Sequence, residues 1–215
     1  MCGRYTFFNN IDSLKHSLNI DVIDTNIIDH QASYNIAPTQ NAPVIFQNNH
    51  KRILKNMRWG LIPSWAKDNS FASNLINARV ETIADKPSFR NLILTNRCIV
   101  VANGYYEWVN IDNKKQPYFI YSGENTMISM AGLWTEWKDV ISFTIITKKS
   151  EHSIRHLHHR MPLMLPKEKI DFFLDNNNIF DDFLVFDDMK LKYHEVSSLV
   201  NSPNNNNESC VNPIY

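Results

Sequence analysis

RCIVVANGYYEW, residues 97–108, is the stretch that decides the fold. Its first half, Arg97–Ala102, ends in a run of apolar residues and predicts a strand that is buried on both faces. Asn103-Gly104 ends that strand, and Tyr105–Trp108 continues beyond it. From the alternation of residue types alone we expect Glu107 to face water. A carboxylate held among aromatic rings would instead have a raised pKa and could act as a general acid or base.

Segments with strand-like and helix-like patterns surround this stretch. Two pairs of strands are separated by short polar turns and predict β-hairpins: 43–47 with 52–59, and 117–121 with 127–134. Further strands are expected at 141–147 and 191–196. Helical patterns cover 11–18, 87–94, 167–174 and 179–186.

Together these elements predict a single α+β domain spanning residues 1–215. We expect a largely antiparallel, barrel-like β-sheet with a few flanking helices. The asparagine-rich end of the chain, about 201–215, has the composition of a mobile polar tail.

The composition narrows the range of functions. The chain has 22 Lys plus Arg residues and 22 Asp plus Glu residues, so a generic basic nucleic-acid binder is excluded and any phosphate contact must come from a local cluster. The five glycines are not spaced as a phosphate loop or a dinucleotide motif requires, so no nucleotide cofactor is expected. The longest apolar run, 98–102, is far too short to span a membrane, and the first residues lack the apolar core of a signal peptide.

Cys2 directly follows the initiator methionine. Removal of Met1 would leave an α-amine and a thiol on one residue, a pair that no other position can offer. Such a 1,2-aminothiol reacts with an aldehyde to form an imine, and the sulfur then closes a thiazolidine ring. A cysteine at this position can also be incidental, so the residue alone does not establish a function.

Two further features carry possible chemistry. Trp65, in a loop that begins near Trp59, could either fill the core or stack on an unpaired base, whereas we place Trp59 in the core. The histidine-rich segment His156–Arg160 could bind a metal ion or an anion. We favour an anion site with one catalytic histidine and expect no metal.

Six separated motifs together resemble one known family, the SOS response-associated peptidases, also called abasic site processing proteins. The motifs are MCGRY (1–5), YNIAP (34–38), WGLIPSW (59–65), NARVET (77–82), GYYEW (104–108) and HHRMP (158–162). The resemblance covers residue 2 to about Pro203. It implies a sensor of abasic sites in single-stranded DNA, which forms a thiazolidine crosslink through Cys2 and shields the lesion during the SOS response to DNA damage. It also implies removal of Met1 by self-processing, the peptidase activity of the family name.

The resemblance further implies roles for individual residues. Cys2 supplies the amine and the thiol, Asn77 holds the N-terminus and the sugar, and Glu107 moves protons during imine formation and ring closure. His158 assists opening of the sugar, although its neighbour His159 is an alternative for this role.

The DNA contacts implied by the resemblance involve three arginines and a tryptophan. Arg79 contacts a phosphate, Arg4 and Arg160 complete a phosphate track, and Trp65 stacks on a base. The implied partner is single-stranded DNA with abasic sites. We expect a monomer without cofactors in the cytoplasm, at the nucleoid in a bacterium or in the nucleus of a eukaryote.

Two other functions remain open from the sequence. An amide hydrolase with an N-terminal cysteine, like the glutamine amidotransferases, also begins Met-Cys-Gly and uses the thiolate to attack a carbonyl. The chain lacks a glycine-rich oxyanion loop of that kind. A non-covalent single-strand binder would rely on Trp65 and the arginines, and Cys2 would have no role.

Overall fold

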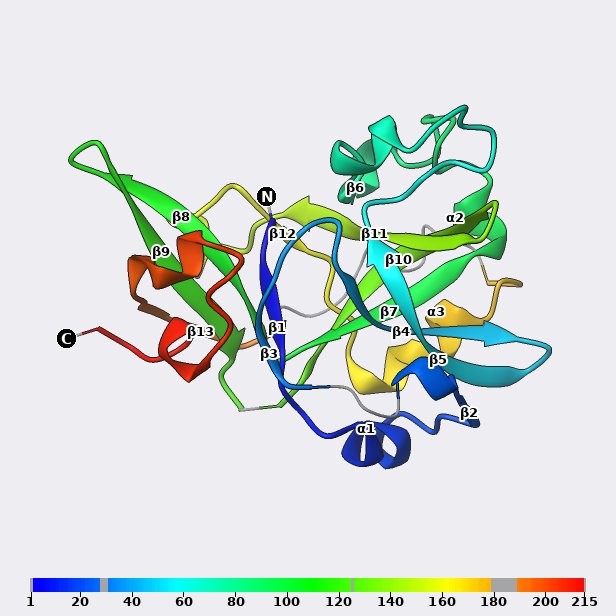
Figure 1. Ribbon diagram of the computed structural model, residues 1–215, viewed down its shortest axis with the longest axis horizontal. Coiled ribbons are helices and arrows are strands. Elements are labelled where there is room, and N and C mark those ends of the chain that lie inside the picture. Colours follow the sequence, from blue (N-terminus) through cyan, green and yellow to red (C-terminus); the bar gives the residue numbers. More distant parts are fainter. Residues whose placement is uncertain (1, 28–30, 125, 179–188, 215) are drawn as a thin grey trace.

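The computed structural model describes residues 2–27, 31–124, 126–178 and 189–214 (Figure 1). The strands are β1 Tyr5–Phe7, β2 Val22–Ile23, β3 Ser33–Ile36, β4 Asn41–Asn48, β5 Lys51–Trp59, β6 Asn77–Arg79, β7 Arg97–Ala102, β8 Gly104–Ile111, β9 Lys114–Ser122, β10 Ile128–Trp137, β11 Val140–Lys149, β12 Arg160–Pro162 and β13 Leu191–Glu195. The α-helices are α1 Ile11–Ser17, α2 Leu92–Thr95 and α3 Ile170–Leu174. The 3-10 helices are η1 Thr25–Ile27, η2 Ser70–Ser73, η3 Val80–Thr82, η4 Lys167–Lys169, η6 Ser198–Asn201 and η7 Glu208–Cys210. The helix predicted at 179–186 lies outside the described residues.

Within the described residues, five strands close into a barrel. The strands β11, β10, β7, β4 and β5 are neighbours in this order, and a parallel pairing of β5 with β11 closes the ring. All the other pairs around the ring are antiparallel. The central strand β7 is buried at every residue, as its apolar run predicts. The predicted α+β fold with a largely antiparallel, barrel-like sheet is therefore confirmed.

Strand β10 packs closely against both of its neighbours in the barrel, β7 and β11. Gly132 of β10 pairs with Cys98 on one side and with Ile145 on the other. A Cβ atom at Gly132 would lie 2.8 Å from the carbonyl oxygen of Thr144 and 3.0 Å from the Sγ atom of Cys98. Only glycine fits there without displacing a neighbouring strand.

A second sheet has the strand order β13-β9-β8-β1-β3. Here β8 and β9 form a hairpin whose turn, Asp112-Asn113, has φ angles of 49° and 64°, a conformation that Asp and Asn tolerate. The predicted hairpin of 117–121 with 127–134 is therefore wrong. Strand β9 pairs with β8 and β13, whereas β10 pairs with β7 and β11 in the barrel.

The predicted hairpin of 43–47 with 52–59 is confirmed by β4 and β5, whose turn at Asn49-His50 has positive φ angles. Of the predicted helix at 87–94, only the part within α2 is helical, and the earlier residues form turns. Bonds from the amides of both Phe89 and Arg90 to the carbonyl of Lys86 close those turns. None of the helices in the described part of the chain is long and apolar enough to cross a membrane.

Two short strands flank the end of β11. Strand β6 runs parallel to β11 and places Arg79 opposite Thr147, whereas β12 runs antiparallel and places Pro162 opposite the same residue. Strand β1 carries the start of the chain along β8, with Tyr5 opposite Tyr105. The topology thus gathers segments that are far apart in the sequence.

The end of the chain packs on the second sheet. The Asn35 amide, on β3, donates hydrogen bonds to the carbonyls of Val200, Ser202 and Asn205 over 2.7–3.3 Å. The indole of Trp108 donates to the Asn201 side chain over 2.7 Å. The expected mobile polar tail is thus folded against the sheet over residues 201–214, because its asparagines form caps and turns with defined partners.

Candidate active site

The start of the chain lies between β8 and β6. Cys2 is fully buried, and the Asn77 side chain donates from Nδ2 to its carbonyl oxygen over 2.8 Å. The Oδ1 atom of Asn77 is buried and has no hydrogen-bond partner among the residues that the structure describes. Because the amide oxygen is an acceptor, it can receive an N–H or O–H bond from a group bound at Cys2. The structure therefore brings Asn77 into contact with Cys2.

Glu107 is buried, with only 4% of its surface exposed. Burial raises its pKa to about 7, and the positive amino terminus of the chain partly offsets this effect. The expectation from alternation, that Glu107 faces water, is wrong. Both faces of β8 are covered at this point: Tyr105 packs in the main core with Cys2, and Tyr106 packs in a separate cluster with the C-terminal segment.

The thiol of Cys2 is not activated by its surroundings. Burial raises its pKa, and the negative charge of Glu107 raises it further. The thiol therefore stays protonated at neutral pH. The charge of Glu107 thus acts on the thiol, and a carboxyl group with a pKa of about 7 can both take up and release a proton near neutral pH.

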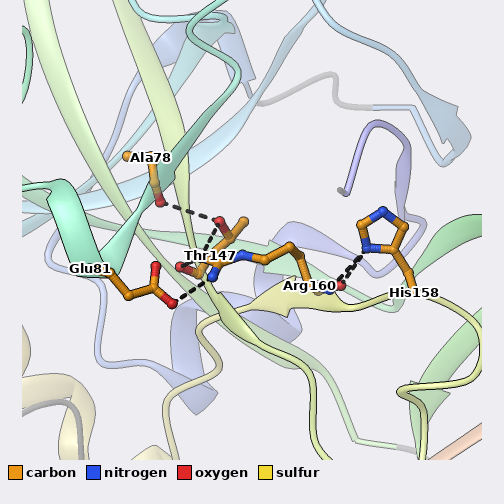
Figure 2. A network of polar contacts seen from close by, with 5 residues as sticks. All are labelled: Ala78, Glu81, Thr147, His158 and Arg160. Carbon is orange, nitrogen blue, oxygen red and sulfur yellow. Dashed lines mark hydrogen bonds and ion pairs between the residues drawn. The ribbon is translucent and has the colours of Figure 1, made fainter.

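His158 is partly buried and lies within electrostatic reach of the amino terminus. Its Nδ1 atom accepts a hydrogen bond from the backbone N–H of Arg160 over 2.9 Å (Figure 2). Burial lowers the pKa of His158, and the positive amino terminus lowers it further. Exposed His159 stacks on the His158 ring with the centroids 4.3 Å apart. Of the two histidines, His158 is thus the one whose ring is fixed by the backbone.

The four predicted DNA-binding residues divide into two pairs. Trp65, with 58% of its surface exposed, and Arg79 both reach the surface. Arg4 is partly buried, and its Nη1 atom donates to the Asn35 side chain over 2.7 Å and to the Val200 carbonyl over 2.9 Å. Arg160 is buried, with Nη1 2.5 Å from Glu81 Oε1. Both arginines therefore make bonds inside the protein.

Several residues at the site had no role in the sequence analysis. Glu81 lies in the NARVET motif and forms an ion pair with Arg160 of the HHRMP motif. The opposite charges of these two motifs are the sequence signal that could have indicated the contact. Tyr5 and Tyr105 are fully buried in the same core as Cys2, and burial is the main cause that raises the pKa of both phenols. Their hydroxyl groups therefore stay neutral.

The histidine-rich segment does not gather into a metal site. Across the described ranges no three His, Cys, Asp or Glu side chains are grouped so that they could hold a metal ion. His156 instead contacts Tyr193 of β13 edge-on, with ring centroids 5.1 Å apart.

The chain is similar to known proteins over most of its length. A family model described as SOS response associated peptidase (SRAP) matches residues 1–203. The chain is 37% identical over 222 residues to the abasic site processing protein YoqW of Bacillus subtilis (strain 168), covering 98% of this chain and 99% of that protein. It is 34% identical over 230 residues to the abasic site processing protein HMCES of Pongo abelii, covering 85% of this chain and 65% of that protein. A crystal structure of a protein from Bacteroides thetaiotaomicron matches with a TM-score of 0.85 and 26% identity over 100% of both chains.

Proposed function

Because the chain belongs to the SOS response associated peptidase family, we propose that it processes abasic sites in single-stranded DNA through a covalent bond to Cys2. An abasic deoxyribose opens to an aldehyde, which is the electrophile that a 1,2-aminothiol captures. The observation that carries the proposal is the meeting of Cys2, Asn77 and Glu107 at the start of the chain.

Removal of Met1 is the first step. In our proposal the Cys2 thiol attacks the carbonyl carbon of Met1, and the amide nitrogen leaves as the free amine with a proton. Water then hydrolyses the thioester, releases methionine and restores the thiol. The net reaction consumes one water and cleaves one peptide bond, in line with the peptidase name of the family.

Crosslinking then consumes the aldehyde. The Cys2 amine adds to the aldehyde carbon, and loss of one water gives an imine. The thiol sulfur adds to the same carbon, its proton is transferred to the imine nitrogen, and a thiazolidine ring closes. Glu107 takes the thiol proton and returns it to nitrogen, since its pKa near 7 lets it act in both directions.

Asn77 and His158 position the reactants. Asn77 fixes the Cys2 carbonyl through Nδ2, and its Oδ1 atom accepts a bond from the amine or from the carbinolamine hydroxyl. His158 donates a hydrogen bond to the sugar oxygen that becomes a hydroxyl when the ring opens.

The exposed side chains at the site are the ones that we propose to contact DNA directly. Arg79 binds a phosphate and Trp65 stacks on a neighbouring base, because both side chains reach the surface. Arg4 and Arg160 add positive charge to the phosphate track from positions inside the protein. We propose that the protein acts inside the cell on its DNA, as a monomer and without a metal or nucleotide cofactor.

The test is the intact mass of the protein before and after incubation with a single-stranded oligonucleotide that carries one abasic site. We expect the protein to lack Met1 and to gain the mass of the oligonucleotide minus one water. The same strand with an intact base should give no adduct, and neither should Cys2→Ala.

Other outcomes point elsewhere. An adduct that persists in Cys2→Ala would assign the bond to another nucleophile. Retention of Met1, absence of any adduct and hydrolysis of glutamine would support the amide hydrolase. Absence of an adduct together with binding to intact single strands would support the non-covalent binder.

A further inference from the structure

A chain of polar contacts crosses β11 beside the site (Figure 2). The Arg160 guanidinium lies 2.5 Å from Glu81 Oε1 through Nη1, and its Nη2 atom donates to the Thr147 carbonyl over 2.6 Å. Weaker contacts link Nη2 to Thr147 Oγ1 at 3.3 Å and Thr147 Oγ1 to the Ala78 carbonyl at 3.4 Å. The chain thus runs from β12 across β11 to β6, where Ala78 follows Asn77 directly.

Glu81 is the member that compensates the buried charge. Arg160 is 7% exposed, and a guanidinium at such a depth is stable only when it is paired and hydrogen-bonded. The hydrogen bond from Arg160 lowers the pKa of Glu81, so the carboxylate stays ionised at neutral pH. Glu81 itself is 40% exposed and lies on η3, immediately after β6.

The backbone of Arg160 sets the tautomer of His158. A nitrogen that accepts the Arg160 N–H cannot carry a proton in the neutral ring, so we assign the proton of neutral His158 to Nε2 from this hydrogen bond. The Arg160 carbonyl lies 3.2 Å from the same Nδ1 atom. A hydrogen bond to that carbonyl would need a proton on Nδ1, so the two contacts exclude each other, and we take the shorter one, from the Arg160 N–H, as the hydrogen bond. With that assignment the ring presents an N–H donor at Nε2.

We propose that Glu81 and Arg160 form a positioning brace, which holds the His158 ring in place as the Nε2–H tautomer. The brace rests on the proposed function, in which this N–H donates to the opening sugar. It also gives Arg160 a role that differs from phosphate binding. If Arg160 positions His158, disturbing it should lower the reaction rate and leave DNA affinity nearly unchanged. If Arg160 binds a phosphate, disturbing it should lower DNA affinity and leave the rate at saturating DNA unchanged.

The test separates binding from reaction in Glu81→Gln. Affinity is measured with a single strand that carries a tetrahydrofuran analogue, which lacks the aldehyde, and the rate of adduct formation is measured at saturating abasic DNA. We expect the rate to fall about tenfold to a hundredfold, as for a misplaced reacting group, with the affinity changed less than about twofold. Arg160→Lys, which keeps the charge but loses the fork, should show the same split. Glu136→Gln, on exposed Glu136 of β10, is the matched control and should leave both quantities unchanged.

A parental rate in Glu81→Gln, or a loss of affinity with an unchanged rate at saturation, would overturn the brace. A second readout does not depend on DNA. Side-chain nitrogen NMR of the parent protein should show His158 as the Nε2–H tautomer at pH 8, and Glu81→Gln should mix the two tautomers. An Nδ1–H tautomer in the parent excludes the brace even if Glu81→Gln does not fold. If the parent forms no adduct, the proposed function fails, whereas the NMR result still decides the brace.

Discussion

Glu107 occupies a position that favours its neutral form. Its pKa in the folded protein is about 7, against an ordinary value of 4.5, because burial penalises the charge. Between these two values the folded protein binds a proton that the unfolded chain has lost, so stability falls as the pH rises through this window. The ionised carboxylate therefore lowers the stability of the fold at the pH at which the proposed base would have to be ionised.

We predict that Glu107→Gln makes the protein more stable and less active. The amide has nearly the same shape but never ionises. At pH 8 the free energy of unfolding should exceed that of the parent by up to about 3 kcal/mol, which corresponds to the pKa shift, and at pH 4 the two should agree. Urea denaturation at both pH values measures this. The rate of adduct formation at saturating DNA should fall about a hundredfold, as for loss of a general base.

The control for this prediction is Glu136→Gln, at an exposed carboxylate of β10, which should leave the rate of adduct formation at its parental value. A Glu107→Gln protein that is less stable than its parent at pH 8 would contradict this prediction. It would mean that neighbouring groups stabilise the ionised Glu107 carboxylate in the folded protein. The base would then have to be sought elsewhere.

At the level of the strands, the local sequence pattern predicted buried strands and tight turns, because both depend on neighbouring residues. The apolar run of β7 and the turn residues of the β4–β5 hairpin were sufficient to place those elements. The partner of β9 was not predictable in this way, since hairpins on either side of it are compatible with its sequence. The partner of β9 is decided indirectly, because β10 pairs with β7 in the barrel instead. The residues between β7 and β10 contain no local pattern that predicts this long-range pairing.

Close packing of β10 between its neighbours leads to the second prediction. Gly132→Ala would press a methyl group against the Thr144 carbonyl and the Cys98 sulfur. We expect a loss of about 1–3 kcal/mol in the free energy of unfolding, since overpacked sites relax only in part. Chemical denaturation measures it. Cys98→Ala in the same chain should recover part of the loss by removing one of the two contacts, and a fully neutral Gly132→Ala would show that the strands can separate without cost.

For the molecule as a whole, the fold brings together residues that the sequence keeps far apart. The resemblance implied Cys2, Asn77, Glu107 and His158 as one site, and the structure places Asn77 against Cys2 through a hydrogen bond. The burial of Glu107 and the internal bonds of the arginines were not predictable, because they depend on how the C-terminal segment and β6 pack on other strands. Opposite charges in two motifs were the only sequence signal for the Glu81–Arg160 pair.

The arrangement of charge over the whole molecule determines how DNA binding responds to salt. Lys plus Arg and Asp plus Glu balance at 22 each, so no general positive field draws DNA to the protein. Of the three predicted phosphate-binding arginines, Arg79 is the exposed one, whereas Arg4 and Arg160 donate to groups within the protein. Few phosphates should therefore be neutralised directly, and affinity should fall only gently with added salt.

We predict that Arg79→Ala removes one direct phosphate contact. The slope of log affinity against log salt for a single strand with the tetrahydrofuran analogue should become less steep by about 0.7, the value for one phosphate on single-stranded DNA. Arg79→Lys should retain the slope because it keeps the charge. Arg160→Lys should also retain it, and its defect should appear in the rate. An unchanged slope in Arg79→Ala, measured by fluorescence anisotropy over a series of salt concentrations, would mean that the phosphate track runs over another part of the surface, because a side chain that contacts no phosphate releases no counterion.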